Sequence, residues 1–382
     1  MLDINLLHHW LVSLRGGEKV LEQFCLLFPG AAIHTLVQTK NPSKLGKIIP
    51  KHQIETTPLG RLPNAEQHYK FLLPFFPKAI GNYKVAGDFI LSSDASLIKG
   101  IKKEDGVPHV CYCHSPPRYL WDMQEDYLRD ISGIKSHIFK RVTPYLRDFD
   151  LRGAENVDHF IANSRYVQER IRRIYGREAE VIHPPVELVN FNYKRPAEDF
   201  YLTVAAQVPY KRIDIAIEAF NRSGKKLVVI GNGSELSRLK SLAKSNVKML
   251  GQQPFNVLKE YYERCKAFIF PGIEDFGITP LEAQAAGKPV IAIEKGGALE
   301  TVIENETGMF FKEQTPEALI DAVEEFERNQ GLFSPEACRK NAERFNPERF
   351  RFEIKNFLIK HYPSYFLDYP WDYEKKKEAV NY

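Results

Sequence analysis

One stretch decides the fold of this 382-residue chain: Phe268-Ile-Phe-Pro-Gly-Ile-Glu274-Asp-Phe-Gly277-Ile-Thr279-Pro280-Leu-Glu282-Ala-Gln-Ala-Ala-Gly287. It begins as a short apolar run and passes through a loop of Pro, Gly and acidic residues. A helix signal follows, with Thr279 as the expected N-cap, Pro280 as the first helical residue and Gly287 as the stop. The stretch therefore predicts a strand, a loop and a helix in succession.

The amino end of this helix is suited to an anion. Backbone amides around Gly277 to Leu281 and the positive end of the helix dipole would face whatever lies above the strand end, and a phosphate fits there. Glu274 and Glu282 bracket the site, and we expect them to bind neutral sugar or ribose hydroxyls because carboxylates repel phosphate. Thr279 and Glu282 also have the spacing of a capping box, in which Glu282 only bonds back to the helix start. The segment alone leaves both interpretations open.

The composition is that of an ordinary soluble globular protein. Hydrophobic residues make up 43% of the chain and charged residues 27%, and 382 residues are more than one core accommodates, so we expect two domains. The net charge of +4 suits anionic ligands or a membrane surface but falls short of a nucleic-acid-binding signature. We therefore expect no nucleic-acid partner.

Two further features concern the compartment. The sequence contains no long apolar run that would span a membrane and no signal peptide. Five scattered cysteines indicate reduced thiols. We expect a protein that acts in the cytoplasm or at the inner face of the plasma membrane.

Strand-like runs alternate with helical patterns, which is typical of α/β domains with parallel sheets. The predicted strands are 4–7, 33–37, 89–92, 109–113, 159–162, 180–182, 200–205, 227–230, 248–250, 267–270 and 290–293. The rigid link His183-Pro-Pro185 marks the domain boundary. We expect an N-terminal acceptor-side domain over 1–183 and a C-terminal donor domain over 184–355, with residues about 356–382 returning to the first domain.

Unusual polar residues follow these strands repeatedly. They are Arg15-Gly16-Gly17, Ser92-Ser93-Asp94, His114-Ser-Pro-Pro-Arg118, Lys211-Arg212, Gly231-Asn-Gly233, Glu274 and Lys295-Gly296-Gly297. Ligands of open α/β sheets collect at the carboxyl ends of strands. Two sheets equipped in this way predict a cleft between the domains.

Two of these groups carry a specific chemical expectation. His114 closes a strand, where a neutral imidazole can bond a sugar hydroxyl, although a purely structural histidine remains the alternative. Lys211 and Arg212 stand at the start of a helix, where cations oppose the helix dipole. They are placed to clamp a diphosphate, and a solvated charge pair is the alternative.

Other patterns weigh against particular functions. Gly16 and Gly17 permit close backbone approach to a ligand, but taken alone they favour a plain tight turn. Gly231-Asn-Gly233 lacks the third glycine of a dinucleotide fingerprint, which argues against a nicotinamide enzyme. Asp148-Phe-Asp150 matches a metal-binding D-x-D pattern but lies late in a polar helical stretch, so we interpret it as a solvated helix end and expect no metal.

Together these residues resemble a retaining glycosyltransferase of family four with the GT-B fold of two facing Rossmann-like domains. The resemblance covers about residues 1–355 and is closest to bacterial mannosyltransferases of O-antigen and exopolysaccharide assembly. It is carried by His9-Trp-Leu-Val-Ser-Leu-Arg-Gly-Gly-Glu-Lys19, Cys113-His-Ser-Pro-Pro-Arg-Tyr-Leu-Trp-Asp122, Phe160-Ile-Ala-Asn-Ser164, Val208-Pro-Tyr-Lys-Arg-Ile-Asp214 and the two glutamates of Glu274 to Glu282.

The resemblance implies a role for each matching residue. His114 would face the donor sugar, Lys211 would hold the diphosphate and Glu274 the sugar hydroxyls, and these are the expected catalytic residues. The expected donor-binding residues are Gly16, Gly17, Arg212, Gly231, Phe276, Gly277, Ile278 and Glu282, with Glu282 on the ribose and the amides of 276–278 on the anion. Many members have Arg where this chain has Ala206, which leaves two alternatives: Arg212 substitutes for that Arg, or the clamp is weaker.

The resemblance further implies a metal-independent reaction with no cofactor. The donor would be a nucleotide-sugar, GDP-mannose in the first place, and the acceptor a lipid-linked or polysaccharide glycan. Two alternatives stay open: a UDP-sugar-dependent transferase of the same fold, and a sugar-nucleotide-binding subunit without turnover.

Two aromatic segments have no assigned chemistry. His68-Tyr-Lys-Phe-Leu-Leu-Pro-Phe-Phe-Pro-Lys78 could rest on a membrane surface or form a core helix broken at Pro74. The segment from Tyr362 to Tyr373 is aromatic and is followed by the basic Glu374-Lys-Lys-Lys377. We expect at least part of it to dock on the first domain.

Overall fold

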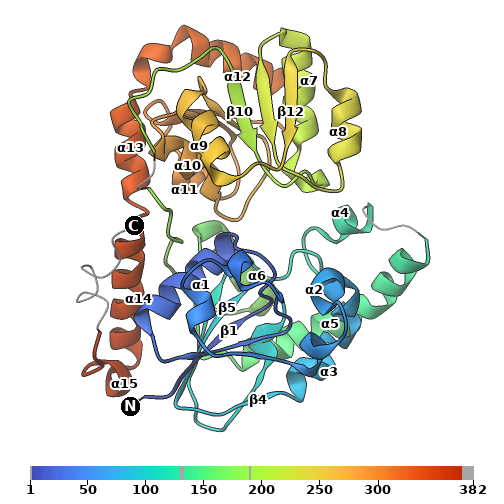
Figure 1. Cartoon of the computed structure of the whole chain (residues 1–382), viewed down its shortest axis with the longest axis vertical. Helices are drawn as coiled ribbons and strands as arrows, with labels where there is room; N and C mark the ends of the chain where they lie inside the picture. The colour runs from blue at the N-terminus through green and yellow to red at the C-terminus, as the bar shows by residue number, and fades with distance from the viewer. Residues whose placement is uncertain (1, 130–132, 189–190, 372–382) are drawn as a thin grey trace. The chain divides into compact units, whose positions relative to one another are not determined.

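The computed structural model describes residues 2–129, 133–188 and 191–371. The chain forms two compact units (Figure 1). The first contains the chain up to Pro185 and again from Pro347, and the second is Val186–Asn346. The sequence predicted the crossings at 183/184 and 355/356, so the chain returns to the first unit earlier than expected.

The first unit is built on a parallel sheet with strand order β3-β2-β1-β5-β7-β8-β9. Its strands are β1 (Ile4–His8), β2 (Ala32–Thr35), β3 (Ile54–Thr56), β5 (Phe89–Asp94), β7 (His109–Cys113), β8 (His159–Ala162) and β9 (Ala179–Val181), and β4 (Lys84–Val85) pairs with β6 (Lys102–Lys103) in a separate ribbon. Its helices are α1 (Gly16–Leu27), α2 (Ala65–His68), α3 (Phe76–Gly81), α4 (Gln124–Arg129), α5 (Ile134–Glu155), α6 (Arg165–Tyr175), α14 (Pro347–His361) and α15 (Pro363–Phe366), with 3-10 turns η1 (Pro42–Leu45), η2 (Ile49–Lys51), η3 (Pro58–Arg61), η4 (Tyr69–Phe75) and η5 (Ile98–Gly100).

The second unit has a parallel sheet with strand order β12-β11-β10-β13-β14-β15. Its strands are β10 (Tyr201–Val204), β11 (Leu227–Ile230), β12 (Val247–Gly251), β13 (Phe268–Phe270), β14 (Val290–Ile293) and β15 (Gly308–Phe311). Its helices are α7 (Ile213–Ser223), α8 (Leu236–Leu242), α9 (Phe255–Arg264), α10 (Ile278–Ala285), α11 (Ala298–Thr301), α12 (Pro316–Arg328) and α13 (Pro335–Glu343), with 3-10 turns η6 (Pro209–Lys211) and η7 (Gln330–Leu332).

Each sheet is buried on both faces, which explains its continuous apolar strands. In β11, Val228 packs into one core with Phe268, while Leu227 and Val229 pack into a second core on the other face. In the first unit, β1 divides in the same way, because Leu6 joins the core under α1 and Leu7 joins a separate core. Successive side chains point to opposite faces of a strand, so each strand supplies two cores.

The strand order places a topological switch point in each unit. In the first unit the chain moves from β1 to β2 on one side and later to β5 on the other. In the second unit β10 lies between β11 and β13 in the same manner. Ligands of doubly wound sheets bind outside the carboxyl ends of the strands at such points.

The predicted strands are confirmed with small shifts at their ends, whereas β3, β15 and the short ribbon of β4 and β6 were missed. The predicted start of the decisive helix was wrong by two residues, because Pro280 was expected as the first helical residue. Helix α10 begins at Ile278 with Gly277 as its N-cap, at φ 95°, so Thr279 lies inside the first turn. Glycine adopts this left-handed backbone without steric cost.

The C-terminal segment packs on the first unit. Helix α14 contributes Phe350 and Ile354 to the core that also contains Phe24 of α1. Farther on, Phe366 is fully buried, and the ring of Trp371 lies 5.8 Å from that of Phe28. The basic residues 374–377 lie outside the described residues.

Two structural features bear on the expected compartment. All five cysteines are free and buried. Within the described segments, no helix combines the length and the apolar character needed to cross a bilayer.

Candidate functional site

His114 lies just beyond the carboxyl end of β7, in the first unit. Its backbone amide donates to the carbonyl of Asp94 at 2.8 Å, and its carbonyl accepts from Asn163 Nδ2 at 2.9 Å. Its ring atom Nε2 lies 2.8 Å from Ser93 Oγ, which in turn lies 3.1 Å from His8 Nδ1. Because β1 and β5 are adjacent with His8 opposite Ser93, the sheet register itself assembles this chain of hydrogen bonds.

The imidazole of His114 is neutral at physiological pH. Burial, followed by the neighbouring His9 and His8, lowers the pKa of His114 to about 3. Burial and His8 likewise lower the pKa of His9 to about 4. A neutral imidazole has one donor and one acceptor nitrogen, so His114 can bond a hydroxyl but carries no charge to lend to a reaction.

The glycine turn before α1 borders the same histidines. Gly16 is the first residue of α1, and a Cβ at Gly17 would lie 3.5 Å from both His114 Nε2 and His8 Cε1. The Glu18 carboxylate accepts from the amide of Arg15 at 2.9 Å, and its other oxygen lies 3.7 Å from His8 Nε2. Burial opposes the charged form of Glu18, but His8 and His9 together lower its pKa overall. The turn thus brings Gly17, Glu18 and His114 into one small region.

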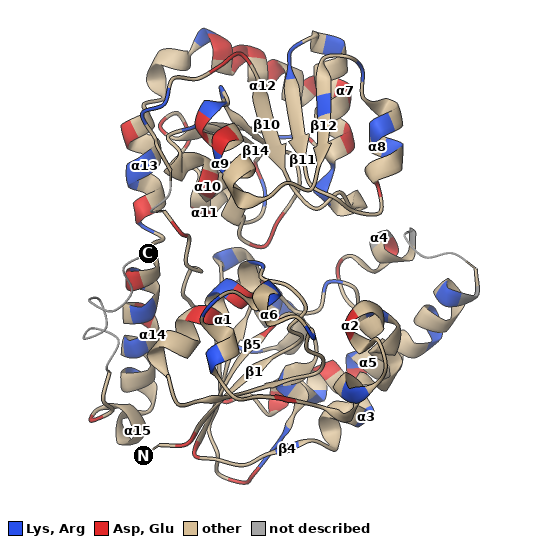
Figure 2. Cartoon of the chain, viewed as in Figure 1, with Lys and Arg blue, Asp and Glu red and all other residues tan. Residues whose placement is uncertain are grey.

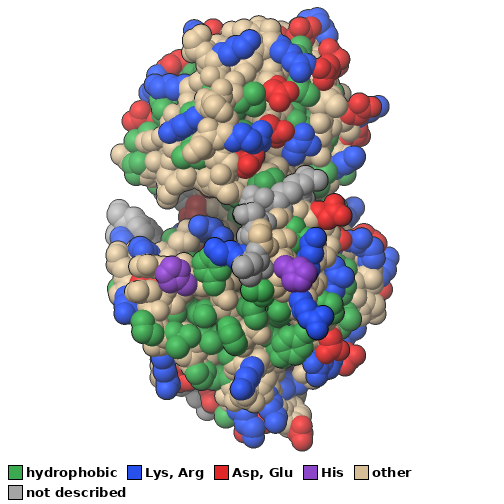
Figure 3. Space-filling view, turned by 90° about the vertical axis from the view of Figure 1, so that its right-hand side faces the viewer, with side chains coloured by type: hydrophobic (Ala, Val, Ile, Leu, Met, Phe, Trp, Pro, Cys, Tyr) green, Lys and Arg blue, Asp and Glu red, His purple; other side chains and the backbone are tan. Residues whose placement is uncertain are grey.

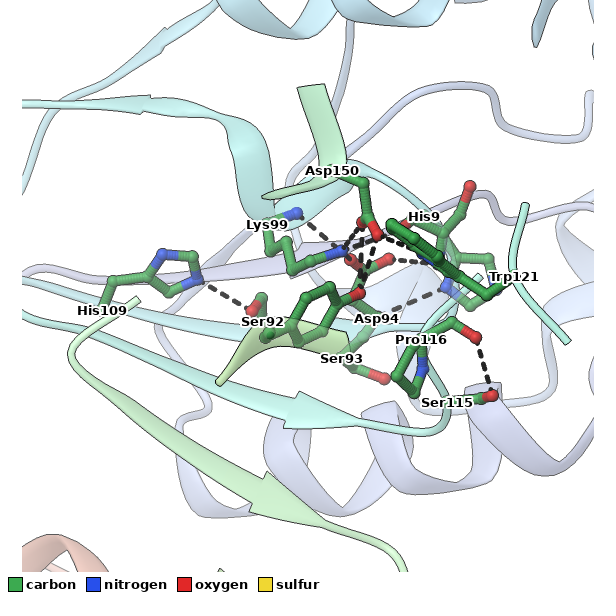
Figure 4. A network of polar contacts seen from close by, with 12 residues as sticks. His9, Ser92, Ser93, Asp94, Lys99, His109, Ser115, Pro116, Trp121 and Asp150 are labelled. Atoms are coloured by element: carbon green, nitrogen blue, oxygen red, sulfur yellow. Dashed lines mark hydrogen bonds and ion pairs between the residues drawn. The ribbon is translucent and has the colours of Figure 1, made fainter. Parts of the chain in front are cut away.

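The interpretation of Asp148-Phe-Asp150 as a solvated helix end was wrong for its second carboxylate. Asp150 is 1% exposed and forms an ion pair with the buried Lys99, which also lies 3.4 Å from Asp94 Oδ2 (Figure 4). Trp121 Nε1 donates to Asp150 at 2.8 Å. Only Asp148 is exposed, where it pairs with Arg152. Asp150 lies on the side of α5 that faces the core, and the ion pair with Lys99 compensates its buried charge.

The second unit places Lys211 and Glu274 together. Lys211 ends the turn η6 after β10, and Glu274 lies in the loop after β13, so both stand at the switch point. Their side chains form an ion pair and are 19% and 11% exposed. At Gly272 a Cβ would lie 2.9 Å from the Lys211 carbonyl oxygen, so the two loops are in close backbone contact.

Arg212 adjoins Lys211 at the start of α7 and pairs with a carboxylate of that helix. Its φ of 50° is left-handed, and its guanidinium pairs with Asp214 at 3.2 Å. A non-glycine residue in this region of backbone space is strained by about 1 kcal/mol. The turn at Arg212 lets the chain pass from η6 directly into α7 while Lys211 points toward Glu274.

The predicted anion site at the start of α10 is made of backbone. Phe276 is 3% exposed and its ring packs on Phe345 at 5.6 Å, so only its main chain is available to a ligand. Gly277 and Ile278 follow as N-cap and first helical residue. A Cβ at Gly297 would collide with the backbone of Phe276, so the 296–297 loop supports this turn from behind.

The remaining two predicted residues lie near this edge of the second unit. Gly231 follows β11, and a Cβ there would collide with the Ala205 carbonyl oxygen at the end of β10. Gly231 therefore allows the loops after β10 and β11 to pack closely together. Glu282 is not explained by a capping box alone, because its Oε2 accepts from the hydroxyl of the buried Tyr262 at 2.8 Å.

Each unit thus groups several of its predicted residues at or next to its own switch point. The first unit groups Gly16, Gly17 and His114, and the second groups Lys211, Glu274 and the start of α10. His8 and Ser93 were not predicted as partners of His114, although the position of Ser92-Ser93-Asp94 after a strand was a signal for Ser93. In the described residues, no group of three or more His, Cys, Asp or Glu side chains is arranged to hold a metal ion.

Two family models match this chain. Glycosyl transferases group 1 matches residues 188–345, and Glycosyltransferase Family 4 matches residues 54–189. The first contains the whole Lys211 and Glu274 site, and the second contains Ser93 and His114.

Curated relatives are similar at low identity. An uncharacterized glycosyltransferase of Methanocaldococcus jannaschii is 26% identical over 66% of this chain and 71% of its own. The O-antigen chain mannosyltransferase RfbU of Salmonella typhimurium is 27% identical over 48% of this chain and 57% of its own. A GDP-mannose-dependent alpha-(1-6)-phosphatidylinositol monomannoside mannosyltransferase of Mycobacterium tuberculosis is 28% identical over 48% of this chain and 56% of its own. The matched region is therefore little more than half of the last two.

Solved structures share the fold. The sucrose-phosphate synthase of Thermosynechococcus elongatus has a TM-score of 0.69 at 18% identity, over 95% of this chain and all of its own. Anabaena HepE in complex with UDP and glucose has a TM-score of 0.67 at 17% identity, over 94% of this chain and 99% of its own. Two parallel-sheet α/β units and these neighbours confirm the GT-B fold class expected from the sequence.

Proposed function

Because this chain belongs to glycosyltransferase family four, we propose that it moves mannose from GDP-mannose to a hydroxyl of a lipid-linked or polysaccharide acceptor, with retention of configuration. The observation that carries the proposal is the pairing of Lys211 with Glu274 beside the amino end of α10. The mannosyltransferases of Salmonella and Mycobacterium among its relatives support the choice of sugar, and the name of the second supports GDP.

The diphosphate of the donor is assigned to Lys211 and to the amides at the start of α10. Lys211 is partly buried, so its charge acts through a medium of lower dielectric than water. The amides from Gly277 onward have no partner within the helix, and the helix dipole adds positive potential there. Both groups stabilise the negative charge that develops on the diphosphate as it leaves. We propose that this replaces the neutralisation a metal would otherwise supply.

The transferred sugar is assigned to Glu274 and His114. Both groups suit hydroxyls, because a carboxylate accepts hydrogen bonds and a neutral imidazole can accept or donate one. The structure offers support for His114 in its lowered pKa and in its fixed contact with Ser93. Glu282, already held by Tyr262, is assigned to the ribose.

The reaction then balances without an added base. The bond from the anomeric carbon to the diphosphate oxygen breaks, and the sugar acquires oxocarbenium character. The acceptor oxygen attacks from the same face, and its proton passes to an oxygen of the departing diphosphate. The products are the glycosylated acceptor and GDP.

Thermal unfolding in the presence of GDP-mannose, UDP-glucose, ADP-glucose and dTDP-glucose tests the donor. A ligand at 100 times its dissociation constant stabilises the folded state by about 2.7 kcal/mol, which raises the melting temperature measurably. We expect the largest shift with GDP-mannose. A shift with the UDP-sugar alone would support the first alternative donor, and a shift with none would remove the donor assignment.

Donor hydrolysis without acceptor tests turnover. The wild type should release mannose slowly from GDP-mannose, and Glu274→Ala should release it at least tenfold more slowly. Release by neither protein, together with GDP-mannose binding, would favour a sugar-nucleotide-binding subunit without turnover.

A further inference from the structure

One surface of the first unit mixes exposed apolar side chains with cationic ones. We call it the basic-aromatic surface. It is defined by Phe71, Phe75, Ile138, Lys135, Lys140 and Arg141.

Two phenylalanine side chains of this surface are largely exposed to solvent. Phe71 of η4 is 58% exposed and Phe75 is 57% exposed, whereas the adjacent Phe76 is 1% exposed. The segment Tyr69–Phe75 is thus neither a buried core helix nor a polar surface turn. Contiguous exposed apolar side chains on a soluble protein mark a surface for an interaction.

Helix α5 interleaves apolar and basic residues on its exposed side. Ile138 is 49% exposed and Tyr145 is 47% exposed, and their spacing of seven residues puts them on one face. Arg141 lies between them on that face, since it is three residues from one and four from the other. Figure 2 shows the Lys and Arg positions on the outer turns of α5.

Acidic residues are absent from both segments in the sequence. Residues 67–87 contain Lys70, Lys78 and Lys84 but no Asp or Glu, and residues 133–147 contain basic residues but likewise no Asp or Glu. A charged surface that served only solubility would mix both signs. The charged side chains within these two segments are therefore all basic, and the next carboxylate of α5, Asp148, is already paired with Arg152.

The two segments are in contact and are supported by the same core. Lys135 Nζ lies over the ring of Phe71 at 4.8 Å, which joins α5 to η4. Beneath them, Phe76 and Leu146 belong to the same core cluster, so both segments rest on one base. Figure 3 shows hydrophobic side chains gathered on this unit with Lys and Arg among them. An open pocket of about 440 Å³, lined by Leu59, Leu72 and Phe75 among others, lies beside the surface.

We infer that the basic-aromatic surface docks on an anionic lipid bilayer. A bilayer supplies at one level the phosphates that Lys135, Lys140 and Arg141 attract, and just below it the hydrocarbon that Phe71, Phe75 and Ile138 enter. An acidic protein would need the same two layers in a matching shape. The inference deepens the proposed function, since it states which face of the chain would meet the membrane that holds a lipid-linked acceptor.

Sedimentation of the full chain with vesicles tests the inference without donor or acceptor. We expect binding to vesicles of phosphatidylcholine with phosphatidylglycerol, and at least tenfold weaker binding to phosphatidylcholine alone. Lys135→Glu/Lys140→Glu/Arg141→Glu should weaken binding to the anionic vesicles by roughly a hundredfold or more, because each basic residue near such a surface contributes about a fivefold factor. Phe71→Ser/Phe75→Ser should weaken binding to both kinds of vesicle.

Matched controls separate this surface from general charge and exposure. Phe352→Ser removes a phenylalanine of α14 that is also 58% exposed, and Lys240→Glu/Lys244→Glu/Lys248→Glu reverses three exposed lysines of the second unit. Both controls should bind as the wild type does, with unchanged circular dichroism for all variants.

Two outcomes would overturn the inference. In the first, the controls lose binding as the test variants do. In the second, the wild type does not sediment with anionic vesicles, which would leave an acidic protein as the partner to seek. Activity on a water-soluble acceptor without vesicle binding would overturn it and leave the proposed function standing, whereas vesicle binding without any transfer would do the reverse.

Discussion

The strand ends of the two units differ in the kind of polar group they carry. In the first unit the side chains nearest the His114 ring are imidazoles and a serine hydroxyl, with the Glu18 carboxylate beyond His8, and burial lowers the pKa values of His9 and His114. In the second unit Lys211, Glu274 and Arg212 are ionic and remain partly exposed. All eleven histidines of the chain lie outside 186–346. Under the proposed function, the neutral side chains of the first unit suit hydroxyls, and the cation of the second unit suits the diphosphate.

Lys211→Ala breaks the charged half of this comparison and should have the largest effect. We expect kcat/KM for transfer to fall about a thousandfold, since our proposal places this cation nearest the leaving diphosphate. Steady-state kinetics with a saturating acceptor measures it. Lys240→Ala, which removes an exposed lysine of α8 in the same unit, is the control and should keep full activity. Activity of Lys211→Ala within threefold of the wild type would contradict the assignment.

His114→Ala breaks the neutral half and should lower kcat/KM about a hundredfold. His114→Gln keeps a hydrogen-bonding group and should lose less. Because the pKa of His114 is about 3, the activity of both the wild type and His114→Gln should follow the same pH profile between about pH 5.5 and 8. An acid limb near pH 6.5 that disappears in His114→Gln would show that the ring titrates during catalysis.

Acid should weaken the first unit selectively. His9, His109 and His114 have folded-state pKa values of about 4, 3 and 3, lowered first of all by burial, and ordinary values near 6.5 once unfolded. The unfolded unit therefore binds more protons below about pH 6.5, so stability falls as the pH drops through that value and continues to fall toward pH 4. Each additional proton costs about 1.4 kcal/mol per pH unit.

Amide hydrogen exchange at pH 7 and pH 5, corrected for intrinsic rates, measures this loss unit by unit. Peptides of β5 and β7 should lose protection, while peptides of β11 and β14 should keep it, since the second unit contains no histidine. Equal loss in both units would contradict the prediction.

Ser93→Ala sharpens the comparison within the first unit. Ser93 positions His114 and does not itself contact substrate in our assignment, so kcat should fall about tenfold with KM little changed. Ser93→Thr retains the hydroxyl and should restore most of the rate. Ser92→Ala is a matched control, because Ser92 Oγ makes the same 2.8 Å contact to His109 instead. Equal losses in Ser92→Ala and Ser93→Ala would point to a structural role alone.

Arg212→Gly should have the smallest effect. Glycine relieves the left-handed strain at φ 50°, and the lost pair with Asp214 is partly exposed, so the free energy of unfolding should rise by up to about 1 kcal/mol. If Arg212 also contacts the diphosphate, KM for the donor should rise a few-fold. Asn305→Gly, at φ 60° in the same unit, is the control and should change stability without changing KM.

Much of the fold could be predicted because parallel strands buried on both faces are continuous apolar runs. The strand 227–230 was predicted residue for residue, as was 290–293. In contrast, β3 reads Ile-Glu-Thr and β15 contains Gly308, and such short or glycine-containing strands have no distinct sequence pattern. These two segments are strands because they pair with β2 and β14.

The site was predictable in its residue types but not in its contacts. Lys211 and Glu274 could be predicted because they follow apolar strands, and ligands of open α/β sheets bind at the carboxyl ends of the strands. That they pair with each other, or that Arg212 turns to Asp214, depends on loop geometry. His8 and Ser93 were missed as partners because they meet only through the adjacency of β1 and β5.

Asp150 was misjudged for a related reason. A polar helical stretch gives no indication of which turn faces inward, and its partner Lys99 lies in a different segment. The burial of the Asp150 carboxylate can be understood only when the position of Lys99 is known.

The chain leaves the first unit at Pro185 and re-enters it at Pro347, and this order has a consequence for biosynthesis. On the ribosome, the second unit has all of its residues available before α14 is made, whereas the core around Phe24 must wait for Phe350 and Ile354. A truncated product that stops before Pro347 would therefore present an open hydrophobic seam to chaperones and proteases. The fragment 186–346, in contrast, contains a continuous sheet with both of its cores and is the part of the chain to express on its own.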